Sequence, residues 1–186
     1  LLNKVPGGTY PPGSTFKTAI ALAAMEAGIT TPDYRVSCSG VFNFGGHAFH
    51  CWQRKGHGSL DVEGALQHSC DVFFYETARR LGIDKIEAAS RKLGLGEPTG
   101  IELPGERGGL IPSREWKLRT QKSVWQQGDT ISVAIGQGYV TATPLQLCQM
   151  AARVASGKSV TARMVHSVGD QLQPRPPVAN LEFGDE

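Results

Sequence analysis

Two residues near the start of the chain have the types and the spacing of a serine nucleophile and its base. Ser14 and Lys17 lie three residues apart, directly after Pro11-Pro12-Gly13, where a helix is expected to begin. That spacing places a hydroxyl and an amine on one face of a helix, within hydrogen-bonding reach. A lysine with a lowered pKa can remove the serine proton, and the positive end of the helix would stabilise an oxyanion. An isolated pair is more often a helix cap beside a solvated lysine, so the interpretation needs a second motif.

The second motif is Ser69-Cys70-Asp71, further along the chain and also where a helix is expected to begin. A Ser-x-x-Lys motif followed by Ser-x-Asn or a close variant is typical of penicillin-binding proteins and serine β-lactamases. Three longer stretches resemble class B penicillin-binding proteins: YPPGSTFK (10–17), LGLGEPTGIELPGE (93–106) and IGQGYVTATPLQL (135–147). Shorter stretches resemble the elongation-type penicillin-binding protein 2 group: GHG (56–58), WK (116–117) and QGDT (127–130). The resemblance extends over about residues 1–166.

The resemblance implies a fold and a domain plan. The fold is the α/β fold of penicillin-binding protein transpeptidases and serine β-lactamases, of which this fragment would hold the helical subdomain and the active-site helix. We therefore expect the fragment to be mainly α with little β. Residues 1–172 are predicted to form a partial transpeptidase domain, and residues 173–186 a disordered or irregular tail that contains three prolines. The first residue is leucine, so we expect the chain to be cut from a longer protein.

The resemblance also implies an activity and a role for each motif residue. The intact protein would be a peptidoglycan D,D-transpeptidase that cross-links stem peptides through a serine acyl-enzyme and is a target of β-lactams. Ser14 would attack the D-alanyl-D-alanine carbonyl, and Lys17 would deprotonate it. Ser69 would relay the proton towards the leaving amine, and Asp71 would orient the substrate amide. The backbone N–H of Ser14 would form half of the oxyanion hole.

The chain departs from the family pattern in two places. Asp71 stands where most of the superfamily has asparagine, although the penicillin-binding protein 2 group tolerates aspartate there. The third family motif, Lys-Thr-Gly or Lys-Ser-Gly, does not occur in the sequence. In the family that motif lies on a strand well beyond the helix that begins near residue 143. We therefore expect this fragment to lack half of the oxyanion hole and to be impaired on its own.

Two other functions are compatible with the same motifs. A non-catalytic β-lactam-binding receptor or scaffold would keep the fold for partner binding, and the missing third motif gives that reading some weight. A serine β-lactamase would need a dedicated base that activates water for deacylation, and no such residue is recognisable in the sequence. A cross-linking assay on the intact protein would separate the transpeptidase from the receptor.

Cysteine and histidine residues indicate a metal site beside the second motif. Cys38, Cys51, His57 and Cys70 are separated by twelve, five and twelve residues, and together they supply the Cys₃His set of a closed structural zinc site. The glycine-rich stretch from 29 to 58 is too long to order itself without some such tie. Reduced buried thiols or a Cys38–Cys51 disulfide are the alternatives. His47 or His50 could replace one cysteine, whereas Cys148 is expected in the core.

Helical periodicity and capping residues place these motifs on elements. Residues 1–13 are expected to be extended, 29–58 a loop or a short hairpin, and 94–112 a turn-rich surface segment. Thr143, Pro144 and Gln146 form a capping box with proline in the first turn, which predicts a helix start. The predicted helices cover residues 14–27, 60–67, 71–81, 84–93 and 143–155.

Composition excludes some classes of partner, and the resemblance suggests others. The net charge is +2, too balanced for a nucleic-acid binder, and the longest apolar stretch, residues 19–25, is too short to span a membrane. The implied partners are peptidoglycan stem peptides, β-lactam antibiotics, and membrane proteins of the elongation complex such as a partner glycosyltransferase. The implied location is a periplasmic domain of a bacterial protein anchored in the inner membrane, with the anchor outside this chain.

Overall fold

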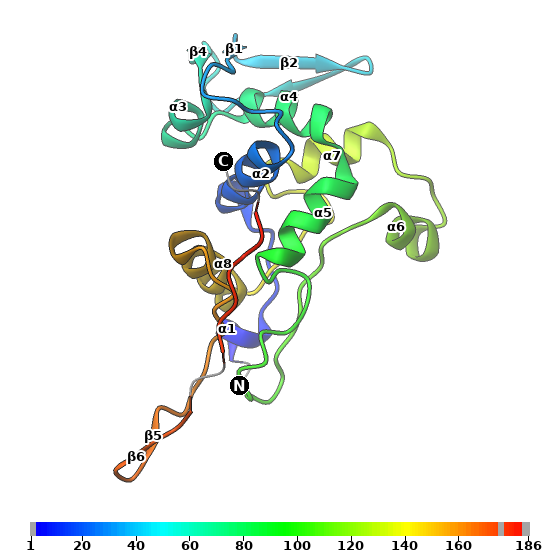
Figure 1. Ribbon diagram of the computed structural model, residues 1–186. Coiled ribbons are helices and arrows are strands. Elements are labelled where there is room, and N and C mark those ends of the chain that lie inside the picture. The colour runs from blue at the N-terminus through cyan, green and yellow to red at the C-terminus, as the bar shows by residue number, and fades with distance from the viewer. Residues whose placement is uncertain (1–2, 175–176, 184–186) are drawn as a thin grey trace. The chain divides into compact units, whose positions relative to one another are not determined.

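The computed structural model describes residues 3–174 and 177–183 (Figure 1). The chain divides into two compact units. Unit 1 combines residues 1–10, 90–111 and 141–186. Unit 2 combines residues 11–89 and 112–140. Each unit is therefore assembled from segments that are distant in the sequence. The interpretation of residues 1–172 as one partial domain stays a prediction, and all the candidate site residues lie in unit 2.

Unit 2 is mainly helical, and helix α4 (Asp71–Leu81) is its central element. Helix α4 packs against α2 (Lys17–Glu26) and against α7 (Gln127–Val133). Their shared core contains the completely buried rings of Phe73 and Phe74 together with Ile20 and Ile131. This core holds the start of α4 against the start of α2, where the two sequence motifs lie. The other helices are η1 (Gly13–Phe16), α3 (Val62–Gln67), α5 (Ile83–Lys92), whose last turn is assigned to unit 1, and α6 (Arg114–Gln121).

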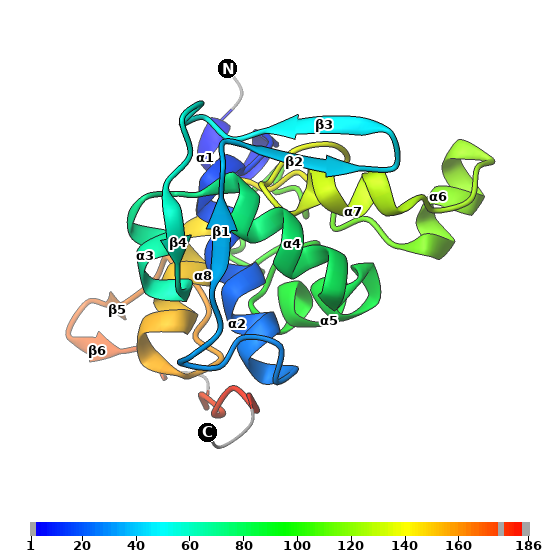
Figure 2. The same ribbon diagram turned by 90° about the horizontal axis from the view of Figure 1, so that it is seen from above.

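Two antiparallel strand pairs order the segment between α2 and α3. Strands β2 (Val41–Phe44) and β3 (His47–His50) form the expected hairpin, with Val41 opposite His50 (Figure 2). Gly45 and Gly46 at its tip both have positive φ, which a two-residue turn of this kind requires. A second pair, β1 (Val36–Cys38) with β4 (Gly58–Leu60), was not predicted, because its partners are three residues each and far apart in the sequence.

Unit 1 contains α8 (Pro144–Ser156), the short helix α1 (Lys4–Gly7), and the hairpin of β5 (Ser167–Val168) and β6 (Gln171–Leu172). The predicted start of α8 is confirmed, because Thr143 and Gln146 form the capping box and Gly157 ends the helix at a φ of +65°. The Gln146 side chain is fully buried and also donates to the carbonyl oxygens of Glu97 and Gly108. The capping glutamine thereby anchors the turn-rich segment 94–112.

Several local expectations were wrong for physical reasons. Residues 4–7 form a helical turn instead of extended chain, and α6 and α7 are helices where none was predicted. Short helices carry too few turns for apolar periodicity to be recognised. Cys148 is exposed, because Gln146, Gln149 and Met150 occupy the buried face of α8. In the segment 94–112, Leu95 and Ile111 are buried instead of exposed.

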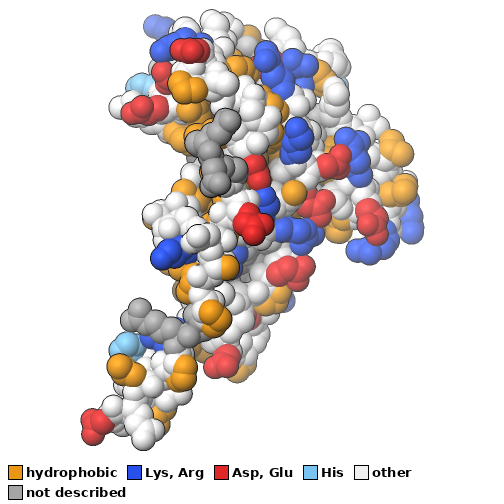
Figure 3. All heavy atoms as spheres, in the orientation of Figure 1, with side chains coloured by type: hydrophobic (Ala, Val, Ile, Leu, Met, Phe, Trp, Pro, Cys, Tyr) orange, Lys and Arg blue, Asp and Glu red, His pale blue; other side chains and the backbone are white. Residues whose placement is uncertain are grey.

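The C-terminal segment and the surface add three further observations. The described part of 173–186 has no helix or strand, and its Asn180 makes a single bridge to Lys158. Within the described residues, no helix has the length and apolar character needed to cross a bilayer. Basic and acidic side chains lie intermixed on the face that Figure 3 shows, in keeping with the small net charge.

Candidate active site and metal cluster

The first motif begins on a short 3₁₀ turn that continues into α2. Ser14 is exposed on this turn, and the N–H of Gly13 donates to the carbonyl oxygen of Gly136 (3.0 Å). A Cβ atom at position 136 would lie only 2.1 Å from the carbonyl oxygen of Gly13. Glycine at 136 is therefore needed for the close approach that fixes the start of the nucleophile turn. The stretch 135–147 was recognised as a motif, but this role for its first glycine was not predicted.

Lys17 is buried, with only 1% of the residue exposed. Its Nζ atom donates to three acceptors: the Ser69 carbonyl oxygen (2.8 Å), Ser69 Oγ (3.0 Å) and Asp71 Oδ1 (2.6 Å). An ammonium group has three hydrogens, so each of them has an acceptor. The ring of Phe74 lies on the apolar side, 5.7 Å from Nζ. Lys17 is thus a fixed interior group and not a solvated residue of the first helical turn.

Ser69 connects the lysine to the exposed serine. Its hydroxyl donates to Ser14 Oγ at 2.9 Å and accepts from Lys17 Nζ at 3.0 Å. The spacing of Ser14 and Lys17 predicted a direct contact, but among the described residues their hydrogen-bonded connection runs through Ser69. The structure therefore brings the two sequence motifs together in one chain of contacts. Such a chain can carry a proton between the hydroxyl of Ser14 and the amine of Lys17.

The backbone of Ser69 has a conformation that is unusual for serine. Helix α3 ends there in a Schellman motif, in which Ser69 N–H donates to the Leu66 carbonyl oxygen (3.1 Å) and Cys70 N–H to that of Ala65 (2.9 Å). Ser69 has a φ of +51°, at the position that glycine usually occupies. For a residue with a Cβ atom, this conformation costs about 1–2 kcal/mol. The surrounding contacts must supply that energy.

Asp71 opens α4, and its carboxylate has protein partners on both oxygens. Oδ1 accepts from Lys17, and Oδ2 accepts from the backbone N–H of Trp52 (3.0 Å). The indole N–H of Trp52 donates to the His68 carbonyl oxygen (3.1 Å). Apart from its position next to Cys51, no sequence signal indicated that Trp52 contacts the second motif. The side chain of His68 is exposed.

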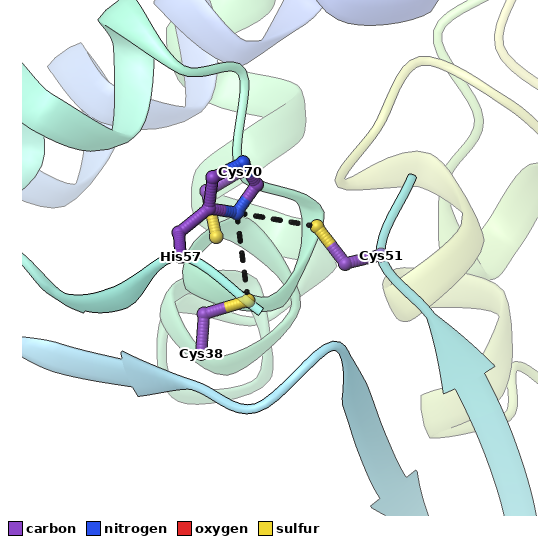
Figure 4. A group of neighbouring side chains, drawn as sticks. All are labelled: Cys38, Cys51, His57 and Cys70. Carbon is purple, nitrogen blue, oxygen red and sulfur yellow. Dashed lines mark hydrogen bonds between the residues drawn. The ribbon is translucent and has the colours of Figure 1, made fainter. Parts of the chain in front are cut away.

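The four predicted metal ligands converge beside this network, as Figure 4 shows. The ligand atoms of Cys38, Cys51, His57 and Cys70 all lie within 4.8 Å of one another. The strand pair β1–β4 brings Cys38 and His57 together, Cys51 follows β3, and Cys70 precedes α4. None of these described cysteines is in a disulfide, and His47 and His50 are exposed on β3, outside the group.

Two separations within this cluster equal those between ligand atoms of a tetrahedral zinc ion. His57 Nδ1 lies 3.6 Å from both Cys38 Sγ and Cys51 Sγ. For Zn–S near 2.3 Å and Zn–N near 2.0–2.1 Å, a tetrahedron requires an N···S separation of about 3.6 Å. Burial lowers the pKa of His57, which favours the neutral imidazole that binds metals. Burial also raises the pKa of the Cys70 thiol to about 12, so a thiolate there needs a cation beside it.

The comparison with protein families covers nearly the whole chain. The family model of the penicillin binding protein transpeptidase domain matches residues 1–182. Peptidoglycan D,D-transpeptidase MrdA of Salmonella typhimurium is 44% identical over 168 residues, which are 89% of this chain and 27% of that protein. The chain therefore spans about a quarter of the length of this relative.

Solved structures of penicillin-binding proteins have a closely similar backbone. Penicillin-binding protein 2 (PBP2) of Pseudomonas aeruginosa, in complex with WCK 5153, superposes with a TM-score of 0.92 at 38% identity, covering 99% of this chain and 41% of that one. PBP2 of Helicobacter pylori, in complex with MreC, gives 0.90 at 32% identity, covering 98% of this chain and 33% of that one.

Proposed function

The chain belongs to the penicillin-binding protein transpeptidase family, and we propose that the intact protein containing it is a peptidoglycan D,D-transpeptidase of the MrdA type. The family and the fold class predicted from the sequence are both confirmed. The observation that carries the proposal is the connected set of Lys17 Nζ, Ser69 Oγ and Ser14 Oγ, with contacts of 3.0 and 2.9 Å. This arrangement suits a serine nucleophile whose proton leaves through a second hydroxyl.

In the proposed first step, Ser14 Oγ attacks the D-alanyl-D-alanine carbonyl of a stem peptide. A bond forms between Oγ and the carbonyl carbon, and the Ser14 proton passes through Ser69 to Lys17. An ammonium cannot accept a proton, so Lys17 must first release one, and Asp71 Oδ1 at 2.6 Å is the acceptor within reach. When the C–N bond breaks, the proton returns through Ser69 to the leaving amine, and D-alanine departs.

In the proposed second step, an amine of another stem peptide attacks the acyl-enzyme. The new amide bond forms as the ester bond to Ser14 Oγ breaks, and the amine proton returns to the serine through Ser69 and Lys17. The Ser14 N–H would stabilise the oxyanion in both steps, with a second donor from a Lys-Thr-Gly strand outside this sequence. Asp71 holds Lys17 in place, and its expected contact with the substrate amide stays a prediction.

Mass spectrometry of the penicillin-treated intact protein tests this proposal. We expect a stable adduct on the peptide that contains Ser14, and its loss in Ser14→Ala. An adduct on Ser69, or unchanged acylation of Ser14→Ala, would contradict the proposal. Cross-linking of stem peptides separates a transpeptidase from a non-catalytic receptor, and rapid loss of the adduct would indicate a β-lactamase.

For the metal cluster, the proposal is a structural zinc ion held by Cys38, Cys51, His57 and Cys70. The 3.6 Å separations and the buried thiols support this choice. The ion would tie the strands β1–β4 to the start of α4, and with four protein ligands it would have no open position for hydrolysis. Its contribution would therefore be to stability.

Elemental analysis of protein purified without added metal tests the zinc proposal. We expect about one equivalent of zinc, since four protein ligands make one closed site. We also expect Cys51→Ser to lower both the zinc content and the melting temperature. Less than about half an equivalent of zinc per protein chain would contradict the proposal. So would full thermal stability in Cys51→Ser.

Partners and location belong to the same proposal. The substrates would be peptidoglycan stem peptides, β-lactams would acylate Ser14, and the domain would act in the periplasm, anchored in the inner membrane. The partners would be membrane proteins of the elongation complex, including a partner glycosyltransferase. The H. pylori PBP2 structure is a complex with MreC, which supports assembly with other proteins. Pull-down of the intact protein from membranes, followed by identification of the co-purified proteins, tests this assignment.

A further inference from the structure

An exposed tryptophan, Trp52, lies against the second motif of the candidate active site. It is 61% exposed, although most large aromatic side chains are largely buried. Both of its N–H groups are nevertheless engaged: the indole N–H donates to the His68 carbonyl oxygen, and the backbone N–H donates to Asp71 Oδ2. Packing in the core therefore does not explain this residue, whereas its polar contacts do.

These two hydrogen bonds lie on either side of Ser69. The His68 carbonyl group immediately precedes Ser69. It lies at the end of α3, where carbonyl groups accept no hydrogen bond from within the helix. Ser69 itself has the left-handed conformation (φ +51°), which a serine keeps only where its surroundings hold it. On the other side, the Trp52 backbone N–H holds Asp71 Oδ2 while Oδ1 faces Lys17. Trp52 thus restrains the segment that carries the relay hydroxyl.

We propose that Trp52 is a positioning residue for acylation. Its indole N–H holds the His68 carbonyl and thereby keeps Ser69 in the left-handed conformation that places Oγ between Ser14 Oγ and Lys17 Nζ. This inference rests on the proposed function, because it concerns the rate at which Ser14 is acylated. Trp52 acts through Ser69 and is not itself a catalytic residue.

The ring of Trp52 makes a second contact, which the test must separate from the first. It meets the His57 ring edge-on, with centroids 5.2 Å apart, so loss of the whole side chain would also disturb the metal cluster. Trp52→Phe keeps an aromatic ring beside His57 but removes the indole donor. Trp125→Phe is a matched control, because its indole N–H donates to Thr130 Oγ1 (2.8 Å), a residue outside both motifs.

Acylation of the intact protein by a fluorescent penicillin measures the effect. The dissociation constant of the non-covalent complex and the maximal acylation rate are determined separately from the dependence on penicillin concentration. We expect Trp52→Phe to lower the maximal rate about three- to tenfold, the loss of one hydrogen bond, with an unchanged dissociation constant. The maximal rate of Trp125→Phe should equal that of the wild type.

Hydrogen exchange gives a readout that needs no activity. In Trp52→Phe, the amides of residues 64–72 should exchange faster than in the wild type, because Cys70 N–H belongs to the turn that the indole restrains. In Trp125→Phe, this segment should exchange at the wild-type rate.

Several outcomes would overturn the inference. These are a wild-type maximal rate in Trp52→Phe, an equal fall in Trp125→Phe, a change confined to the dissociation constant, or unchanged exchange over residues 64–72. Failure of the wild-type protein to acquire an adduct on Ser14 would instead contradict the proposed function. In that case, the exchange measurement still decides whether Trp52 holds the Ser69 turn.

Discussion

Two buried lysines in unit 2 have almost the same immediate surroundings. Lys17 Nζ lies 2.6 Å from Asp71 and 5.7 Å from the centre of the Phe74 ring. Lys117 Nζ, on α6, lies 2.5 Å from Asp129 and 5.8 and 5.7 Å from the rings of Trp125 and Tyr139. Both side chains are less than a tenth exposed. Burial, a carboxylate and an aromatic ring therefore do not distinguish a candidate base from a structural lysine.

The acceptors beyond the carboxylate make the difference. Lys17 reaches Ser69 Oγ, which reaches the exposed Ser14. For Lys117, the structure places Asp129 Oδ2 in the capping box of α7, where it also accepts from the backbone N–H of Gln126 (2.7 Å). One lysine is thus connected to a hydroxyl that faces solvent, and the other is connected to a helix start. Of these two lysines, Lys17 is therefore the candidate base, because its hydroxyl chain leads out of the core.

Alanine substitution of each lysine in turn should produce the largest difference in acylation rate. In the intact protein, we expect Lys17→Ala to slow acylation by penicillin about 10²- to 10⁴-fold, the usual contribution of a general base. Lys117→Ala should unfold at a lower temperature but acylate at the wild-type rate while folded. The measurement is the second-order acylation rate constant. Equal losses in the two variants would show that the comparison is wrong.

The next largest effect is expected when the 186-residue chain is studied apart from the rest of the intact protein. This 186-residue chain contains the network but no Lys-Thr-Gly or Lys-Ser-Gly motif. Loss of one oxyanion donor typically lowers the rate about 10²- to 10³-fold. The isolated chain should therefore be acylated that much more slowly than the intact protein in a side-by-side assay. Equal rates would mean that the network alone suffices.

Removing the partner of the structural lysine should change stability and not chemistry. Asp129→Ala leaves the Lys117 ammonium buried without its carboxylate, which costs about 3–5 kcal/mol when a buried pair is broken. Urea unfolding measures this loss. Asp84→Ala is the matched control, because the pair of Asp84 with Arg114 is exposed and should contribute less than about 1 kcal/mol. A similar loss in both variants would contradict the assigned difference in burial.

The smallest effect is expected at the partly exposed ion pairs of Glu76 with Arg79 and Arg80. Hydrogen bonds from Arg79 and then Arg80 lower the pKa of Glu76, although burial opposes them. A carboxyl group with a lowered pKa stabilises the fold above its ordinary pKa near 4.5, and this contribution is lost as the pH falls below that value. Glu76→Gln should thus cost no more than about 1 kcal/mol near neutral pH and nothing in acid. Urea unfolding at both pH values checks this; an equal cost in acid would refute it.

The sequence predicted the elements that carry their own local signals. Helix α4 matches the predicted range 71–81, and α8 starts at the predicted capping box of Thr143 and Gln146. The helices α6 and α7 were missed although Ser113 caps α6 and a capping box begins α7, because each has too few turns for apolar periodicity to be recognised. The strands β1 and β4 were missed because each has three residues and a partner distant in the sequence. Trp52 was missed as a site residue for the same reason, since its partners are His68 and Asp71.

Some features of the candidate site could likewise be predicted from local sequence, and others could not. Residue types, order and spacing were enough to select Ser14, Lys17, Ser69 and Asp71 and to identify the family, because these motifs are short and specific. The convergence of three cysteines and His57 was also expected from the ligand set. Only the tertiary structure decided that Lys17 meets Ser14 through Ser69, that Ser69 is held at positive φ, and that Asp71 is engaged on both oxygens. These features depend on packing between α2, the end of α3 and the start of α4, and local propensity carries no information about contacts more than fifty residues apart.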